Sequence, residues 1–378
     1  MISKFRIGVL VIILNFFASV ATTWGQVENP SLLQMAVPSL NIAPDARGGG
    51  MGDMGAATLP DINSQYWNAA KYAFMGSKAG VSLSYTPWLR KLVNDVALVN
   101  MTGYYKLGNS DLQAISASLR YFSLGEVNIW ENIGDVPYGL NPYEMAFDVA
   151  YSRKLSESYS MAVTLRYIRS DMGTDQNEES NAGNAFAADI SGYLEKYVLM
   201  GNAEALWSFG FNLSNIGSKI SYDGGNRNQY LPAKLTLGTG LLYPIDDYNQ
   251  IGVYLDLNKY MVPYAPQKKD GETDADFQAR EDDYKSWSSI SGMLKSFTDS
   301  PNGLLKEIMV SVGAEYSYNE QFFVRGGYFY ENANVGNRKY FSVGAGFRMS
   351  VFQLDAAYLI STVPVSYTHL TLPTNSLV

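Results

Sequence analysis

The sequence predicts an all-β protein, a transmembrane antiparallel β-barrel of the bacterial outer membrane. Three observations support this prediction. The chain opens with an export signal, it then repeats alternating stretches of strand length, and the breaks between these stretches are alternately long and short. Lipid offers no hydrogen-bond partner to an open sheet edge, so an exported chain that crosses a membrane with strands must close them into a barrel.

Residues 1–25 have the pattern of a secretory signal peptide. Lys4 and Arg6 supply the positive start, and 7–20 is a mostly apolar run followed by small residues. We expect cleavage just before Gln26. The apolar run is shorter than the roughly 20 residues that a membrane-spanning helix needs, so the sequence predicts an exported chain rather than a helical anchor.

Beyond the N-terminal part, thirteen stretches alternate with period two, as strands do. In the stretch 111–124, Leu119 and Tyr121 share one face, while Ser118 and Arg120 share the other. In a membrane barrel the apolar face meets lipid and the polar face lines the lumen. A soluble sandwich gives the same alternation with the faces exchanged, so periodicity alone does not separate the two folds. The expected strands are 79–87, 96–108, 111–124, 143–155, 158–170, 184–199, 204–214, 232–244, 249–260, 307–318, 321–331, 340–350 and 351–361.

Connection lengths favour the barrel over the sandwich. Outer-membrane barrels have short periplasmic turns and longer extracellular loops, in strict alternation. The stretches also fit the roughly 9–11 residues that a tilted spanning strand needs. The long breaks are 88–95, 125–142, 171–183, 215–231, 261–306 and 332–339, and each is followed by a break of a few residues.

We expect the barrel to cover 79–363 and to have fourteen strands. Bacterial barrels built from one chain have an even number of strands, and the sequence shows thirteen. Residues 364–378 do not alternate, and the stretch 366–374 resembles translated sequencing-adapter read-through. We therefore interpret 364–378 as a non-native tail in place of the last strand, with a natural tail as the alternative.

Composition excludes several kinds of site. The chain has no cysteine and a single histidine, His369, which leaves no thiolate metal site and no disulfide and almost excludes a histidine-based triad. The net charge of −8, with no basic block, argues against a nucleic-acid partner. The run 50–55 formally matches G-x-G-x-x-G, but no strand–turn–helix unit surrounds it. The sequence therefore predicts no enzyme, no cofactor and no metal centre.

Three loop regions leave alternatives open. The acidic stretches 171–179 and 270–283 lack the EF-hand spacing, so solvated charge is the better interpretation, although calcium binding stays open. The Gly-rich segment 26–78 is expected as a compact turn at or in the periplasmic mouth, and the sequence does not decide whether the lumen is open or plugged.

The loops 125–142 and 261–306 carry the candidate partner-binding residues. Apolar and aromatic side chains on an exposed loop either form a protein-binding surface or fold back into the lumen. In the second loop, Met293 and Leu294 are expected with two aromatic neighbours on the apolar side of a short helix. The candidates from both loops are Trp130, Ile133, Tyr138, Leu140, Trp287 and Phe297.

The segment 43–74 carries a family resemblance. Two motifs in it resemble the N-terminal signature of the PorV (LptO) family. They are Ala-Pro-Asp-Ala-Arg-Gly-Gly-Gly-Met-Gly-Asp-Met-Gly-Ala-Ala at 43–57 and Asn-Ser-Gln-Tyr-Trp-Asn at 63–68. That family belongs to the type IX secretion system and to the wider FadL-like β-barrels, which have fourteen strands. Ala69 departs from the family pattern, which usually has proline there, and order and length of elements extend the resemblance from about residue 30 to 361.

The resemblance implies a non-enzymatic outer-membrane shuttle for protein secretion. Such a protein binds the C-terminal signal domains of secreted cargo, receives them from the translocon barrel and delivers them to the PorU-containing attachment complex. The alternative is a FadL-type transporter of hydrophobic small molecules, which needs an apolar lumen pocket; a purely structural barrel is a third possibility. The inner faces instead predict a wet lumen, because they carry Arg120, Glu144, Asp148, Arg166, Glu315 and Asp355.

Overall fold

The computed structural model describes residues 33–88, 95–108, 112–129, 138–173, 182–222, 228–269, 271–301 and 303–362, which all fall within one compact unit, Ser31–Val378. The expected signal peptide, 1–25, and the expected non-native tail, 364–378, lie outside these residues. Within the described ranges, no helix has both the length and the apolar character needed to cross a membrane.

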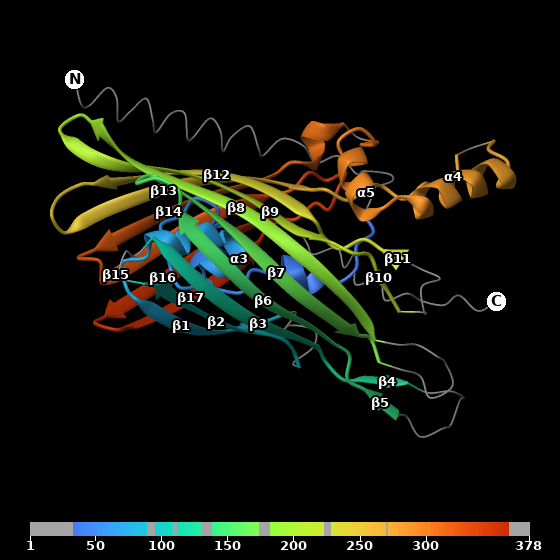
Figure 1. The fold of residues 1–378 in the computed structure, drawn as a ribbon, viewed down its shortest axis with the longest axis horizontal. Coiled ribbons are helices and arrows are strands. Elements are labelled where there is room, and N and C mark those ends of the chain that lie inside the picture. The colour runs from blue at the N-terminus through green and yellow to red at the C-terminus, as the bar shows by residue number, and fades with distance from the viewer. Residues whose placement is uncertain are drawn as a thin grey trace. The chain divides into compact units, whose positions relative to one another are not determined.

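Thirteen strands form one curled sheet in which every neighbouring pair is antiparallel (Figure 1). They follow the chain order, as a barrel meander does, and each boundary lies within about three residues of the expected one. The strands are β1 (Ala79–Pro87), β2 (Val96–Leu107), β3 (Gln113–Leu124), β6 (Tyr143–Lys154), β7 (Tyr159–Asp171), β8 (Gly183–Met200), β9 (Ala203–Gly217), β12 (Lys234–Pro244), β13 (Asn249–Tyr260), β14 (Met309–Tyr318), β15 (Phe322–Tyr330), β16 (Lys339–Met349) and β17 (Phe352–Ser361).

The remaining elements are short and lie before the sheet or in its long connections. Two small hairpins, β4–β5 (Val127–Ile129, Tyr138–Leu140) and β10–β11 (Ile220–Ser221, Asn228–Gln229), extend from the ends of long strands. The helical elements are η1 (Pro38–Asn41), α2 (Ala46–Gly49), α3 (Ser64–Trp67), η2 (Ala69–Phe74), α4 (Asp274–Ser286), α5 (Ser289–Lys295) and η3 (Leu304–Glu307).

The two faces of the sheet have the polarity of a membrane barrel. On the outer face, Leu119 is 44% exposed and Leu165 is 67% exposed, whereas the adjacent arginines Arg120 and Arg166 point inward and are buried. A soluble protein would bury the leucines and expose the arginines. The structure thus resolves the ambiguity that periodicity leaves, and it confirms the barrel fold and the predicted register.

The sheet ends at β1 and β17, which are not paired with each other in the described part of the chain. Neighbouring strands alternate in direction, so the first and the thirteenth strand run the same way. One further strand would be antiparallel to both of these edges. The fourteenth strand that the sequence leads us to expect remains a prediction.

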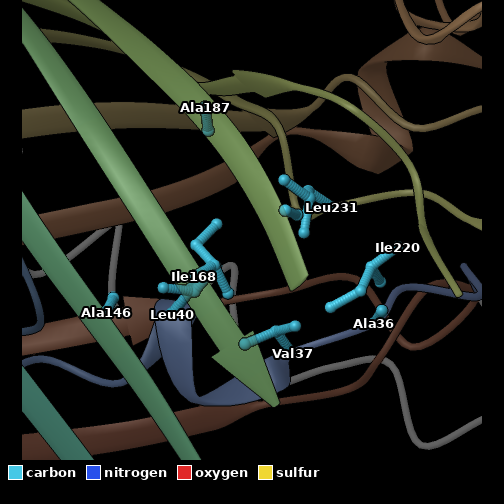
Figure 2. Close-up of a cluster of buried hydrophobic side chains, with 9 residues drawn as sticks. Ala36, Val37, Leu40, Ala146, Ile168, Ala187, Ile220 and Leu231 are labelled. Atoms are coloured by element: carbon cyan, nitrogen blue, oxygen red, sulfur yellow. The ribbon is translucent and has the colours of Figure 1, made fainter. Parts of the chain in front are cut away.

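The segment 33–78 lies against the inner face of the sheet, within its curve (Figure 1). Val37 and Leu40 pack with Ile168 at the long-loop end of β7, in a cluster of nine buried apolar residues (Figure 2). At the opposite end of the strands, the buried residues of η2 pack with Tyr104 and Ala162. The sequence predicts a compact turn at or in the periplasmic mouth, but the segment instead extends along the lumen from one end of the strands to the other.

Candidate partner-binding loops and a filled lumen

The Gly-rich turn is held by its own side chains and by the strands that it touches. Asp45 caps α2 by accepting from the Gly48 N–H at 2.8 Å, and its second oxygen accepts from Trp67 Nε1 at 2.6 Å. Gly52 has φ +84°, and a Cβ there would lie 2.9 Å from the backbone N and O of Tyr328. Gly52 is therefore required by backbone-to-backbone packing against β15, whereas a Cβ at Gly48 or Gly55 would instead meet the ring of Trp67.

A chain of ion pairs joins this turn to the late strands. Arg47 donates to both carboxylate oxygens of Glu315, at 3.0 and 2.8 Å, and to Asp61 at 2.7 Å. Glu315 on β14 also accepts from Arg325 on β15 at 2.6 Å, and Arg325 pairs with Asp355 on β17. Buried charges are tolerated when they are paired and hydrogen-bonded, and each of these is.

A second cluster lies on three adjacent strands. Arg166 donates to Asp148 at 2.6 Å and to Asp189 at 2.9 Å, and all three side chains are buried. The inward-facing charges that predict a wet lumen therefore form ion pairs and hydrogen bonds with one another and with the N-terminal segment. That interpretation is wrong because strand alternation shows which side chains face inward but not what covers them.

Two cavities remain near the long-loop ends of the strands. Their volumes are about 20 Å³ and about 10 Å³, so each has room for little more than one water molecule. Lys234 and Tyr66 line both cavities. Neither cavity is the apolar pocket that a carrier of hydrophobic molecules requires.

The 125–142 loop is described only in part. Trp130 and Ile133 lie outside the described residues. Tyr138 and Leu140 are the ends of β5, which pairs with β4 in register Val127–Leu140. Figure 1 shows this hairpin continuing beyond the ends of the main strands, so the described part of the loop does not fold back into the lumen.

In the 261–306 loop, helix α4 stands off from the rest of the protein. It has no buried residue, and its start is capped by Thr273, whose Oγ1 accepts from the Asp276 N–H at 3.2 Å. Arg280 folds back onto Glu272, with Nη2 2.6 Å from the carboxylate, and this hydrogen bond lowers the pKa of Glu272 to about 2. Only the C-terminal end of the helix touches other parts of the protein, where the ring of Tyr284 packs on Tyr230 and Lys219 donates to the Lys285 carbonyl at 3.1 Å.

Helix α5, in contrast, is anchored on the barrel rim. Met293 is buried against Ala233 and Met261. Lys259, at the end of β13, donates to the Ser296 carbonyl at 3.0 Å and pairs with Glu307 at 2.6 Å, which ties both α5 and η3 to the strand.

The two aromatic candidates of this loop have different environments. Trp287 is half-buried, with its ring against Tyr284 and the Lys295 ammonium 3.4 Å from its centroid, so it braces the loop. Phe297 is partly exposed on the rim. The short helix exists as expected, but Met293 points inward and Leu294 outward, so they do not share one face.

Exposed apolar side chains gather on α5 and η3, and we call this set the rim patch. Ile290 is 64% exposed, Leu294 68% and Leu305 82%. The sequence reasoning missed most of these residues, although the spacing of 290, 294 and 297 is that of one helical face. The rim patch comprises Ile290, Leu294, Phe297, Leu304 and Leu305.

The described residues do not form a metal site or a phosphate site. No group of three or more His, Asp or Glu side chains placed to hold a metal ion occurs in the described ranges. The run 50–55 is covered by strand backbone at Gly52, so it does not present the open amides that a bound phosphate would need.

The chain matches one known protein family and is similar in fold to several solved structures. Residues 26–268 match the family "Type IX secretion system protein PorV". No curated protein matches. Among solved structures, a FadL homologue from Pseudomonas aeruginosa has 10% identity, a TM-score of 0.43, and coverage of 86% of this chain and 90% of its own. The Pseudomonas putida toluene transporter TodX has 9% identity, a TM-score of 0.44, and coverage of 82% and 90%.

Proposed function

Because the chain belongs to the PorV family of the type IX secretion system and is an outer-membrane β-barrel, we propose that it is a shuttle for secreted proteins. It binds the C-terminal signal domain of cargo leaving the translocon barrel and passes it to the PorU-containing attachment complex. It acts as a binding protein rather than an enzyme. Its partners meet it at the long-loop end, which in outer-membrane barrels is the extracellular side.

One observation carries this proposal: exposed apolar side chains lie on the long loops while the lumen behind them is filled. The segment 33–78 occupies the inner face from one end of the strands to the other. The available surface for a macromolecular partner is therefore outside, at the loops. Exposed apolar patches on a rim of polar residues are typical of protein-binding sites.

The rim patch is the first candidate for the contact with cargo. Its side chains project from α5, which Met293 and Lys259 anchor, so a partner meets a largely preorganised surface. Preorganisation lowers the entropy cost of binding. The β4–β5 hairpin, with Tyr138 and Leu140, is the second candidate, together with Trp130 and Ile133 of the same loop.

Transport of hydrophobic small molecules is the weaker proposal. It requires a continuous apolar path, but buried ion pairs join Arg47 of the segment to Glu315 and Arg325 on the barrel wall. Moving the segment aside would break these pairs, and a broken buried pair leaves an uncompensated charge.

The test is capture of a cargo C-terminal signal domain by variants of the full protein. The triple change Ile290→Ser, Leu294→Ser, Leu305→Ser should lower capture at least about tenfold, because it removes three large apolar side chains whose burial would each contribute about 1.5–3 kcal/mol. The matched control changes three exposed polar residues of α4, Gln278→Ser, Asp282→Ser and Asp283→Ser, and should capture cargo as the parent does.

A heat-modifiability gel should show a folded barrel for both triple variants. If the rim-patch variant folds and captures cargo like the parent, while deletion of 127–140 abolishes capture, the contact lies in the hairpin loop. If neither change affects capture, the proposed loop contact is wrong.

A further inference from the structure

At the short-turn end of the barrel, the β8–β9 hairpin extends past the neighbouring β6–β7 turn (Figure 1). Strand β7 begins at Tyr159, which pairs with Leu194, whereas β8 continues to Met200 before it turns. The β12–β13 and β14–β15 hairpins, in contrast, end almost level, since the first residue of β13 pairs with the last of β14. The tip of β8, residues 195–200, therefore has no strand beside it on the β7 side.

The main chain of this tip forms an open sheet edge. The Glu195 N–H donates to the Ser158 carbonyl at 2.9 Å, the last described bond from β8 to the β7 side. Every second residue of an antiparallel strand directs its N–H and C=O to the same side, so Tyr197 and Leu199 also point there. Among the described residues, nothing bonds to these groups on that side. Such an edge is a template for pairing with another strand.

The side chains of the same edge are apolar and exposed. Tyr197 and Leu199 lie on the inner face of the sheet, in line with Tyr193, whose ring contacts Phe74 of the N-terminal segment. Tyr197 is 68% exposed and Leu199 is 75% exposed. Charged residues and proline are the usual protection of a free edge, and residues 196–200 contain only one such residue, Lys196.

The tip lies on the periplasmic side of the membrane. Short turns mark the periplasmic end of an outer-membrane barrel. On the outer face of the hairpin, Lys196 is paired with Trp207, and tryptophan is typical of the membrane–water interface. The hairpin beyond this pair is therefore in water, at the opposite end of the barrel from the rim patch.

We propose that the edge of β8 at residues 196–200 is a docking site for an extended segment of a periplasmic protein. The segment adds to the sheet as a strand antiparallel to β8, in line with β7. The free N–H and C=O groups of Tyr197 and Leu199 require a partner main chain, which a lipid chain does not supply. Their side chains favour a segment with apolar residues at every second position. This site is separate from the proposed contact with cargo.

The experiment is a fluorescence-anisotropy titration of the full protein in nonionic detergent. The probe is the peptide fluorescein-Gly-Ser-Thr-Val-Glu-Leu-Thr-Val-Gly-amide. In an antiparallel strand, the residues opposite Tyr197 and Leu199 share their face and direct their amides to the edge. N-methylation of the Val and Leu amides should therefore weaken binding at least about tenfold, because several hydrogen bonds are lost. N-methylation of the Thr and Glu amides should leave binding unchanged.

Variants of the hairpin test the same edge from the side of the protein. Leu199→Pro removes one free N–H, and because proline is accepted on edge strands the variant should fold but bind the probe at least about tenfold more weakly. Tyr197→Ser with Leu199→Ser should have a similar effect. The matched control, Ile245→Ser with Tyr248→Ser, also removes one exposed aliphatic side chain and one exposed tyrosine, from the adjacent β12–β13 turn, and should bind as the parent does.

Several outcomes overturn the proposal: no saturable binding of the probe, equal effects of the two N-methylated peptides, or equal loss in the hairpin and control variants. If the parent forms dimers that Leu199→Pro abolishes and does not bind the probe, the edge joins two copies of this chain instead. A heat-modifiability gel confirms that each variant is folded. Cargo capture should be unchanged in all of these variants, so the test is independent of the shuttle function.

Discussion

The N-terminal segment 33–78 and the loop 261–306 are both long excursions from the sheet, but they differ in how they are held. The segment buries Arg47, Lys71 and Trp67, and its backbone packs directly on strands. The loop includes α4, which buries nothing, and α5, which is anchored while exposing Leu294. The segment is therefore part of the protein core, whereas the loop is an exposed surface on which a partner can bind.

Gly52 in the segment and Gly271 in the loop give the sharpest test of this difference. Both have positive φ, +84° and +79°, but a Cβ at Gly52 would meet Tyr328 backbone at 2.9 Å, whereas nothing lies within 4 Å of a Cβ at Gly271. Gly52→Ala should prevent most of the protein from reaching the folded, heat-modifiable form. Gly271→Ala carries only the left-handed strain, about 1–2 kcal/mol, and should fold. Equal yields of the two variants would contradict the packing described for the segment.

Arg47 and Arg280 extend the comparison to ion pairs. Arg47→Ala leaves Arg325 as the only cation beside the buried Glu315, and Asp61 loses its ion-pair partner. The change should therefore lower the free energy of unfolding by about 3 kcal/mol, measured by urea denaturation in detergent. Arg280→Ala removes a partly exposed pair that lies within one surface loop, so it should change stability much less than Arg47→Ala does.

A double variant isolates the Arg47–Glu315 interaction. Arg47→Ala combined with Glu315→Gln should be less destabilised than the sum of the single changes, because the residues share one network. Additive effects would show that the pair does not contribute through the contact seen here.

Leu119 and Leu294 complete the series, since both are exposed leucines but only one faces lipid. Leu119→Arg should cost about 2–4 kcal/mol if it lies near the bilayer midplane. Leu294→Arg should leave the barrel as stable as the parent and reduce only cargo capture. Refolding into lipid vesicles and comparing the midpoints of denaturation tests both, and a similar cost for the two would mean that the outer face of β3 is wrongly assigned.

Much of the sheet could be predicted because its signal is local. The alternation of Leu119 and Arg120 along one strand is enough to assign their faces. The alternation of long and short connections indicates that consecutive strands are neighbours in the sheet. Helix α4 carried a readable signal as well, the cap Thr273 with Asp276 three residues on, which the acidic composition of the loop obscured.

The path of the N-terminal segment could not be predicted in this way. Its position depends on partners such as Glu315, 268 residues from Arg47, and no periodic pattern encodes such a pairing. The same holds for the candidate site: Ile290 and Leu294 have helical spacing, but the burial of Met293 against Ala233 and Met261 decides which side faces outward.

The reach of Arg47 to β14 and of Gly52 to β15 also constrains the order of assembly. The first part of the exported chain finds its final contacts only after nearly all the strands have been delivered. The final packing of the segment is thus a late step of assembly, and because it joins residues far apart in the sequence we expect it to be slow.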